Sequence, residues 1–235
     1  MRLTTLAKCL LPLAVALMPT TGVDAQTPGI PVLQNAFLNP GLAIAADFGG
    51  GAGQSFGGLA AGWGLGTSTQ RGSARIQLSA AAGAGRGNGA TRGAYGGRVA
   101  FTAWISAGGS LGVGAFGGMG GAPRTRSNGS VTNAAVLIVP AGITFSYRRP
   151  IGTTRGLSVY ASPMYSWVRS ATDVSTVNRS GLRAAVGLDF AFSPALGATI
   201  GGEFGASQLT PVNGGRGGSG SFGAAISFVP GRRGQ

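Results

Sequence analysis

The chain has 235 residues, of which 46 are glycine, 18 are basic and five are acidic, with no histidine and one cysteine. This glycine content excludes a largely helical protein, because each glycine inside a helix costs about 1 kcal/mol relative to alanine. A hydrophobic content of 43% is too high for a disordered chain, so we expect one folded β domain.

The first 25 residues have the organisation of a secretory signal peptide. Arg2 and Lys8 make the start positive, residues 9–18 form an apolar stretch, and small residues precede a cleavage point after Ala25. The apolar stretch is too short for a spanning helix, which needs about 20 residues. An uncleaved anchor is the alternative. Cleavage would remove Cys9 and the only lysine, leaving no thiol for a disulfide or a lipid anchor.

After a lead-in at 26–40, apolar residues alternate with polar or tiny ones, as on a strand whose two faces meet different surroundings. Leu182, Val186 and Leu188, for example, alternate with Arg183 and Asp189. Period and turn residues predict ten strands in a domain spanning 41–229, followed by a short tail at 230–235. The predicted strands are 41–49, 56–65, 74–84, 95–105, 111–119, 134–147, 157–168, 182–192, 196–204 and 221–229.

The connections between these strands alternate in kind. Those at 66–73, 106–110, 148–156 and 193–195 are mostly tight, whereas most of the others are longer and polar and run through Asn88, Asn128, Asn178 and Asn213. A transmembrane barrel with both ends on one side predicts this sorting, and an exported chain without a helical span has the closed barrel as its membrane option. We therefore predict a single closed antiparallel up-and-down β-barrel, with eight or twelve strands as alternatives to ten.

Two prolines interrupt this pattern. Pro140 and Pro163 fall inside predicted strands, and a closed barrel has no free edge to accommodate proline. They are about equally far from the turn between them. We expect a shared bulge or kink at one level.

Aromatic residues are predicted to form two belts at the membrane interfaces. Phe48, Phe56, Tyr95, Phe116, Trp167, Phe204 and Phe222 lie near one set of strand ends, and Trp63, Trp104, Phe145, Tyr147, Phe192 and Phe228 lie near the other. Ordinary core aromatics, the competing interpretation, would favour strand centres.

Each charged residue within a strand alternates with the large apolar residues of that strand. Its side chain therefore points to the opposite face, into the lumen. This set comprises Asp47, Arg75, Arg98, Arg183, Asp189 and Glu203. A charge on the lipid face would cost about 2–4 kcal/mol at the midplane. Inside a narrow lumen the charges should form an ion-pair network. The tight turn at 193–195 predicts that Arg183 lies opposite or diagonal to Glu203 and forms a salt bridge with it.

The last predicted strand carries a further pattern. Ser221, Gly223, Ile226 and Phe228 read polar-x-Gly-x-x-apolar-x-apolar. This resembles the terminal β-signal that the insertion machinery of outer-membrane barrels recognises. The mature chain as a whole resembles small outer-membrane β-barrels of the OmpA-like or opacity type. The resemblance implies location in the bacterial outer membrane and passage through that machinery during biogenesis.

Catalytic and metal-binding residue types are scarce. Without histidine, and without cysteine or lysine after cleavage, the usual bases, thiol nucleophiles and metal ligands are missing, so we predict no enzyme activity, no metal and no cofactor. Asp47, Asp189 and Glu203 could form a carboxylate pair, but an arginine is available to each. Residues 112–117 match G-x-G-x-x-G without the strand-to-helix context, and 214–218 resemble a single RGG segment, which in an exported chain predicts no nucleic acid.

Basic residues remain abundant after cleavage. Removal of Arg2, Lys8 and Asp24 reduces the 18 basic and five acidic residues to 16 and four. Seven arginines fall in the predicted outer loops, where they are candidates for binding the phosphates of lipopolysaccharide: Arg86, Arg92, Arg124, Arg126, Arg169, Arg179 and Arg216. A solvated basic face is the alternative.

Three functional hypotheses follow from the sequence. The first is a non-enzymatic integral outer-membrane barrel with a structural or surface-interaction role. The second is a narrow channel or porin, because a ten-strand lumen is slightly wider than one that side chains just fill. The third is a soluble secreted or periplasmic β-barrel. The sequence assigns no ligand and no oligomeric state.

Overall fold

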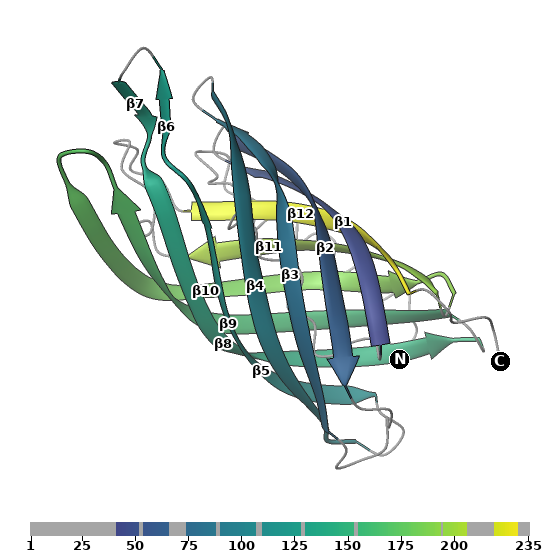
Figure 1. Ribbon diagram of the computed structural model, residues 1–235. Helices are drawn as coiled ribbons and strands as arrows, with labels where there is room; N and C mark the ends of the chain where they lie inside the picture. The colour runs from purple at the N-terminus through teal and green to yellow at the C-terminus, as the bar shows by residue number, and fades with distance from the viewer. Residues whose placement is uncertain are drawn as a thin grey trace.

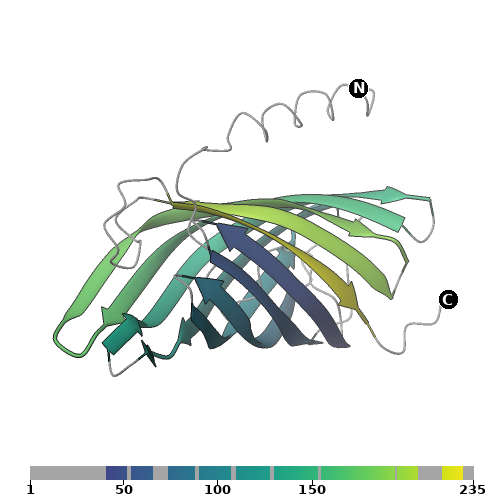
Figure 2. The same ribbon diagram turned by 90° about the horizontal axis from the view of Figure 1, so that it is seen from above.

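The protein is a closed β-barrel of ten antiparallel strands, seen in a computed structural model from two directions in Figures 1 and 2. The described residues are 41–51, 54–65, 74–87, 90–106, 110–127, 130–152, 155–193, 195–205 and 219–229. The predicted signal peptide, lead-in and tail lie outside these residues.

Each barrel strand pairs with its neighbours in chain order, and β1 pairs with β12 to close the cylinder. The strands are β1 (Gly41–Gly51), β2 (Gln54–Leu65), β3 (Ala74–Gly87), β4 (Ala90–Trp104), β5 (Leu111–Ala122), β8 (Ala135–Ile151), β9 (Arg155–Ala171), β10 (Thr176–Ala191), β11 (Leu196–Gly205) and β12 (Ser219–Phe228). The prediction of ten strands in up-and-down order is therefore confirmed.

A small hairpin, β6 (Thr125–Ser127) and β7 (Ser130–Asn133), extends from one end of the barrel between β5 and β8 (Figure 1). The sequence pattern predicts a loop here. We call this end the hairpin end. The opposite end, where β1 begins and β12 ends, is the terminal end. Strands on the near and far walls run in different directions in Figure 1, because every strand is tilted against the barrel axis.

Several strands are longer than predicted, mainly at the hairpin end. β3 and β4 extend to Gly87 and from Ala90, and Asn178 and Arg179 lie inside β10 rather than in a loop. Apolar alternation stops where the side chains leave an apolar environment, whereas backbone pairing continues beyond that point. At the terminal end, β8 and β9 continue to Ile151 and from Arg155, and Gly152 has a φ of 67°, a conformation that favours glycine.

The two strand prolines do not produce the expected shared bulge. Pro140 interrupts the β5–β8 ladder, where pairing stops at Gly117–Ala141 and resumes at Gly120–Ile138. A second gap in the β8–β9 ladder lies between Gly142–Met164 and Phe145–Ala161, at the level of Pro163. Register is the same on both sides of each gap. The missing N–H of each proline is therefore accommodated by local loss of pairing on separate ladders.

Candidate functional site

The outer face of the barrel is apolar on all ten strands. Large hydrophobic side chains that would be buried in a soluble protein are exposed here, including Leu182 at 73%, Leu59 at 66% and Ile200 at 57%. Soluble monomers rarely expose contiguous apolar patches larger than a few hundred Å². An unbroken apolar cylinder wall requires an apolar solvent.

Charged residues mark the two edges of the apolar band on β9. On β9 the outward positions from Leu157 to Trp167 are uncharged, and they are flanked by the exposed residues Arg155 and Arg169. Ten residue steps at about 3.3 Å, tilted by about 35–45°, give a band about 25 Å high. This height matches the apolar band of a transmembrane barrel.

Aromatic residues occupy both edges of this band, with two exceptions among the described side chains; that of Phe56 lies outside them. Phe48, Tyr95 and Phe222 toward the hairpin end, and Trp63, Phe145, Tyr147, Phe192 and Phe228 toward the terminal end, are all exposed on the outer face. Phe116 and Trp104 instead point inward, at 6% and 3% exposure, so their assignment to the belts is wrong. Their positions were deducible, because Trp104 has the same parity as Arg98.

All six charged residues predicted to face the lumen lie on the inward face of their strands. Asp47, Arg75, Arg98 and Arg183 are buried, with exposures of 2%, 3%, 5% and 8%, and Asp189 and Glu203 are half-buried. The parity argument therefore holds for each of them. Confinement of ionised groups to the lumen removes the cost of placing them against lipid.

The predicted pair of Arg183 and Glu203 is present. Arg183 pairs with Gly205 and Ala185 with Glu203, so the two charged residues are diagonal neighbours on β10 and β11. The Nε atom of Arg183 lies 3.1 Å from the Oε1 atom of Glu203. The Nε–H vector is not aligned as a hydrogen bond, so the contact is chiefly electrostatic. Gly205 leaves room for the arginine, since a Cβ there would lie 2.7 Å from Arg183 Cγ.

The other two lumen arginines lie over aromatic rings. The guanidinium carbon of Arg75 is 5.8 Å from the Trp104 ring centroid, and that of Arg98 is 5.9 Å from the Phe116 ring centroid. Both distances are within the range of cation–π attraction. Arg98 also interacts electrostatically with Asp47.

Asp189 differs from the other two lumen acids. It accepts a hydrogen bond from the side chain of Thr199 and lies near the hydroxyl of Tyr160. Among the described residues it forms no salt bridge, so the expectation of an arginine partner for each acid is wrong here. Arg183 pairs with Glu203 instead, and Arg98 interacts with Asp47.

A plug of buried side chains fills the middle of the lumen. Tyr160, Met164, Phe116, Ala100 and Ala185 form one cluster, each at most 7% exposed. Tyr160 extends across β10 and β11, where a Cβ at Gly187 or Gly201 would lie only 2.5 Å from its hydroxyl oxygen. The tyrosine ring therefore occupies the space that these two paired glycines leave open.

Below this plug, toward the terminal end, the lumen contains a cavity of about 200 Å³. Alanine and glycine from β1, β2, β11 and β12 form part of its wall. Asp47, Asp189 and Arg98 line it in the interior, and Arg148 lines it near the β8–β9 turn.

The candidate phosphate-binding arginines do not form one site. Arg86 and Arg169 are exposed on the outer face, on strands β3 and β9 that lie far apart around the barrel. Arg92 donates a hydrogen bond to the carbonyl oxygen of Ala134 at 3.2 Å. Arg179 lies within β10. The side chain of Arg126 and all of Arg216 lie outside the described residues.

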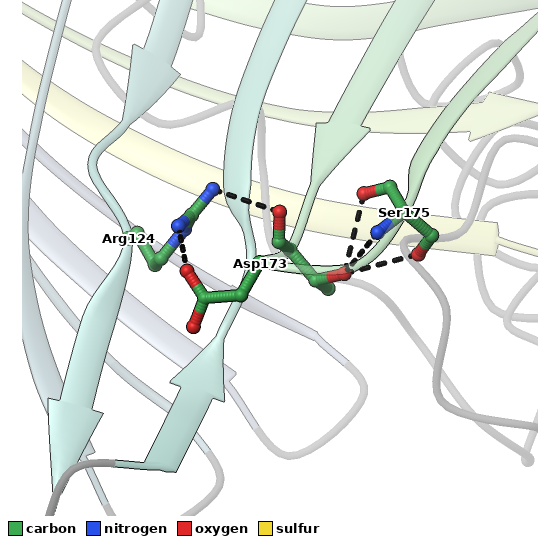
Figure 3. A network of polar contacts seen from close by, with 4 residues as sticks. Arg124, Asp173 and Ser175 are labelled. Atoms are coloured by element: carbon green, nitrogen blue, oxygen red, sulfur yellow. Dashed lines mark hydrogen bonds and ion pairs between the residues drawn. The ribbon is translucent and has the colours of Figure 1, made fainter.

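Arg124 has a structural partner. It pairs with Asp173, and its Nη2 atom donates to the carbonyl oxygen of Thr172 at 2.9 Å, while the Thr172 hydroxyl interacts with Ser175 in the same turn (Figure 3). These contacts connect the base of the β6–β7 hairpin to the β9–β10 turn. Asp173 therefore offsets the charge of Arg124, and among the described side chains of the predicted set Arg86 and Arg169 are the exposed ones.

The predicted β-signal lies on β12, next to the seam with β1. Gly223 faces inward, and Ile226 and Phe228 face outward at 57% and 50% exposure. The side chain of Ser221 lies outside the described residues. Recognition by the insertion machinery stays a prediction.

Within the described ranges, no three histidine, cysteine, aspartate or glutamate side chains come together as a metal site. The same part of the chain contains no helix long and apolar enough to cross a membrane.

No protein-family model and no curated protein sequence matches the chain. Among solved structures, the chain is similar to Neisserial surface protein A, with 11% identity, a TM-score of 0.38 and coverage of 80% of this chain and 96% of that one. It is similar to the NanC porin, with 11% identity, a TM-score of 0.40 and coverage of 80% and 99%. It is also similar to the translocator domain of the autotransporter NalP from Neisseria meningitidis, with 13% identity, a TM-score of 0.44 and coverage of 96% and 94%. The fold assignment rests on the strand order and register of this chain.

Proposed function

We propose that this chain is a non-enzymatic integral protein of the bacterial outer membrane with a structural or surface-interaction role. The observation that carries the proposal is the outer face, an apolar band about 25 Å high with aromatic edges and arginine rims. Such a band is stabilised by lipid and would cause aggregation in water.

Membrane location is tested by fractionation and by gel migration. We expect extraction only by detergent, and faster migration of unheated than of heated protein, because a closed barrel resists unfolding by detergent at room temperature. Protease added to whole cells should cut within 206–218, the segment that connects β11 to β12 in the sequence. A protein that stays soluble without detergent would support the third hypothesis instead, a soluble secreted or periplasmic barrel.

A structural role is favoured over a channel by the plug in the lumen. Tyr160, Met164 and Phe116 form a buried cluster in the lumen, and Arg183 pairs in register with Met164. In planar bilayers we expect the purified protein to give no stable single-channel steps. Reproducible steps with the unmodified chain would favour the porin hypothesis.

An anionic-lipid contact at the hairpin end is a second element of the proposal. Arg86 and Arg169 lie on the outer face at this rim, where guanidinium groups can bind lipopolysaccharide phosphates in bidentate fashion. Replacement of both by glutamine should weaken retention on lipopolysaccharide-containing vesicles. Arg155→Gln, at the opposite rim, is the control and should have no such effect. Equal retention of all variants would contradict this contact.

Insertion through the barrel-assembly machinery is proposed from Gly223, Ile226 and Phe228 on β12. Phe228→Ala should lower the amount of assembled barrel in cells more than its stability in detergent, since the residue would act during biogenesis. Phe222→Ala, another exposed aromatic on the same strand, is the matched control.

A further inference from the structure

The cavity at the terminal end contains acidic groups whose hydrogen-bonding capacity the described protein does not satisfy. Asp47 is 2% exposed and lines the cavity, yet its Oδ1 atom has no hydrogen-bond partner among the described residues. The Oδ2 atom of Asp189, on the same cavity wall, also has none. Buried carboxylate oxygens without donors are costly, so a donor group is expected at this position.

Register places the two acids in one row of cross-strand partners. Asp47 pairs with Ala225, Ala225 with Thr199, and Thr199 with Asp189, so the acids lie on inward positions of β1 and β10 with two strands between them. Of the two inward residues between them, Ala225 is small and Thr199 is the hydrogen-bond partner of Asp189.

The charges around the cavity leave one acid without a counter-ion. Arg98 interacts with Asp47, whereas Asp189 has Thr199 and Tyr160 as polar neighbours and forms no salt bridge among the described residues. Arg148 is at the exposed end of the cavity and lies over Gly156, where a Cβ would be 3.3 Å from its Nε atom. The lining thus carries two acids and two arginines, and Asp189 is the acid that forms no salt bridge with a described residue.

Wall composition keeps this space open. One level higher, Gly187 and Gly201 are covered by the Tyr160 ring, so small residues there serve packing. At the cavity level, Ala45 and Gly197 face a volume of about 200 Å³ that no described side chain fills. That volume equals the share of about six or seven water molecules in the liquid, which is enough for a chain of four carbons with a terminal amine.

We infer that this cavity binds a small ammonium-bearing solute. The ammonium group donates a hydrogen bond to Asp189 Oδ2, and the hydrocarbon part lies against the alanines of β1. The inference goes beyond the proposed function and rests on the barrel fold, not on membrane location.

Calorimetric titration of the detergent-solubilised full chain at low ionic strength tests the inference. The probes are 1,4-diaminobutane, its neutral analogue 1,4-butanediol and its anionic analogue succinate. We expect the diamine to bind and the two analogues to bind about 10- to 100-fold more weakly, which is the loss anticipated when one charge-assisted hydrogen bond is removed. Equally tight binding of the diol or of succinate would overturn the assignment of an ammonium ligand.

Variants locate the site. Asp189→Asn should weaken diamine binding about 10- to 100-fold, and Asp173→Asn, which removes an acid at the hairpin end, should leave it unchanged. Ala45→Leu should abolish binding by filling the cavity without changing charge, and it decides the question if the Asp189 variant does not fold.

Gel migration of unheated samples shows that each variant is a folded barrel. The inference is overturned if the folded wild-type chain does not bind the diamine. It is also overturned if the folded Asp189 and Ala45 variants bind the diamine as tightly as the wild-type chain does. Either result leaves the proposed membrane function intact. Loss of the barrel signature in the wild-type chain would instead contradict the proposed function.

Discussion

Substitution of Ala161 by arginine tests the lipid-facing assignment most directly. Ala161 is exposed on the outer face of β9, between the exposed side chains of Phe145 on β8 and Val186 on β10. Because the native residue is small, the substitution adds a charge while removing little apolar area.

The expected magnitude follows from the position of Ala161 within the band. It lies six residue steps from Arg155 and eight from Arg169, which correspond to about 15 and 20 Å along the barrel axis after correction for tilt. A single arginine side chain cannot reach either rim from there. We expect a loss of folding free energy of about 2–4 kcal/mol, the cost of arginine at the bilayer midplane. This loss corresponds to a decrease of about 30- to 700-fold in the folding equilibrium constant.

Urea titration of folding into phospholipid vesicles measures this loss, and Ala171→Arg is the matched control. Ala171 faces outward at the hairpin end of β9, next to the native Arg169. Arginine there should cost about 0–1 kcal/mol, as near a bilayer interface. If both variants change stability by less than about 0.5 kcal/mol, as surface substitutions do in soluble proteins, the outer face does not contact lipid.

Three further predictions concern the lumen and the hairpin end. Glu203→Gln should destabilise the barrel by about 3–5 kcal/mol in the same titration, because it leaves the Arg183 guanidinium buried without its counter-charge, and combining it with Arg183→Met should recover most of the loss; no recovery would refute the ion-pair argument. Gly201→Ala should cost about 1–3 kcal/mol through its clash with the Tyr160 hydroxyl, and Tyr160→Phe in the same chain should relieve it; additive losses would show that the clash lies elsewhere. Arg124→Ala should accelerate amide hydrogen exchange in β6 and β7 while changing global stability by less than about 1 kcal/mol, and unchanged exchange would indicate that the ion pair does not hold the hairpin.

The sequence was sufficient for the strand order and for the two faces of the wall. Period-two alternation identifies which side chains share a face, and in a closed barrel one face must meet lipid and the other the lumen. Arg98 and Asp47 were placed correctly on this basis alone, as was the Arg183–Glu203 pair, because a tight turn fixes cross-strand register.

The sequence predicted the strand ends and the positions of the aromatic side chains less well. The sequence pattern predicts a loop at Asn178, but backbone pairing continues through it. The hydrogen bonds of a hairpin do not depend on which side chains it carries, so the pattern does not indicate this extension. Distance along the strand predicts Trp104 and Phe116 in the belts, whereas both side chains are buried in the lumen.

By itself the sequence determined a strand wall with an apolar outside and a charged inside, since this pattern depends on neighbours within one strand or one tight hairpin. Only the tertiary structure decided how the lumen is filled. The stacking of Arg75 and Arg98 on aromatic rings, the reach of Tyr160 over Gly187 and Gly201, and the cavity that leaves Asp189 without a counter-ion all depend on which strands face one another across the closed cylinder. That arrangement is set by tilt and closure, which no single strand encodes.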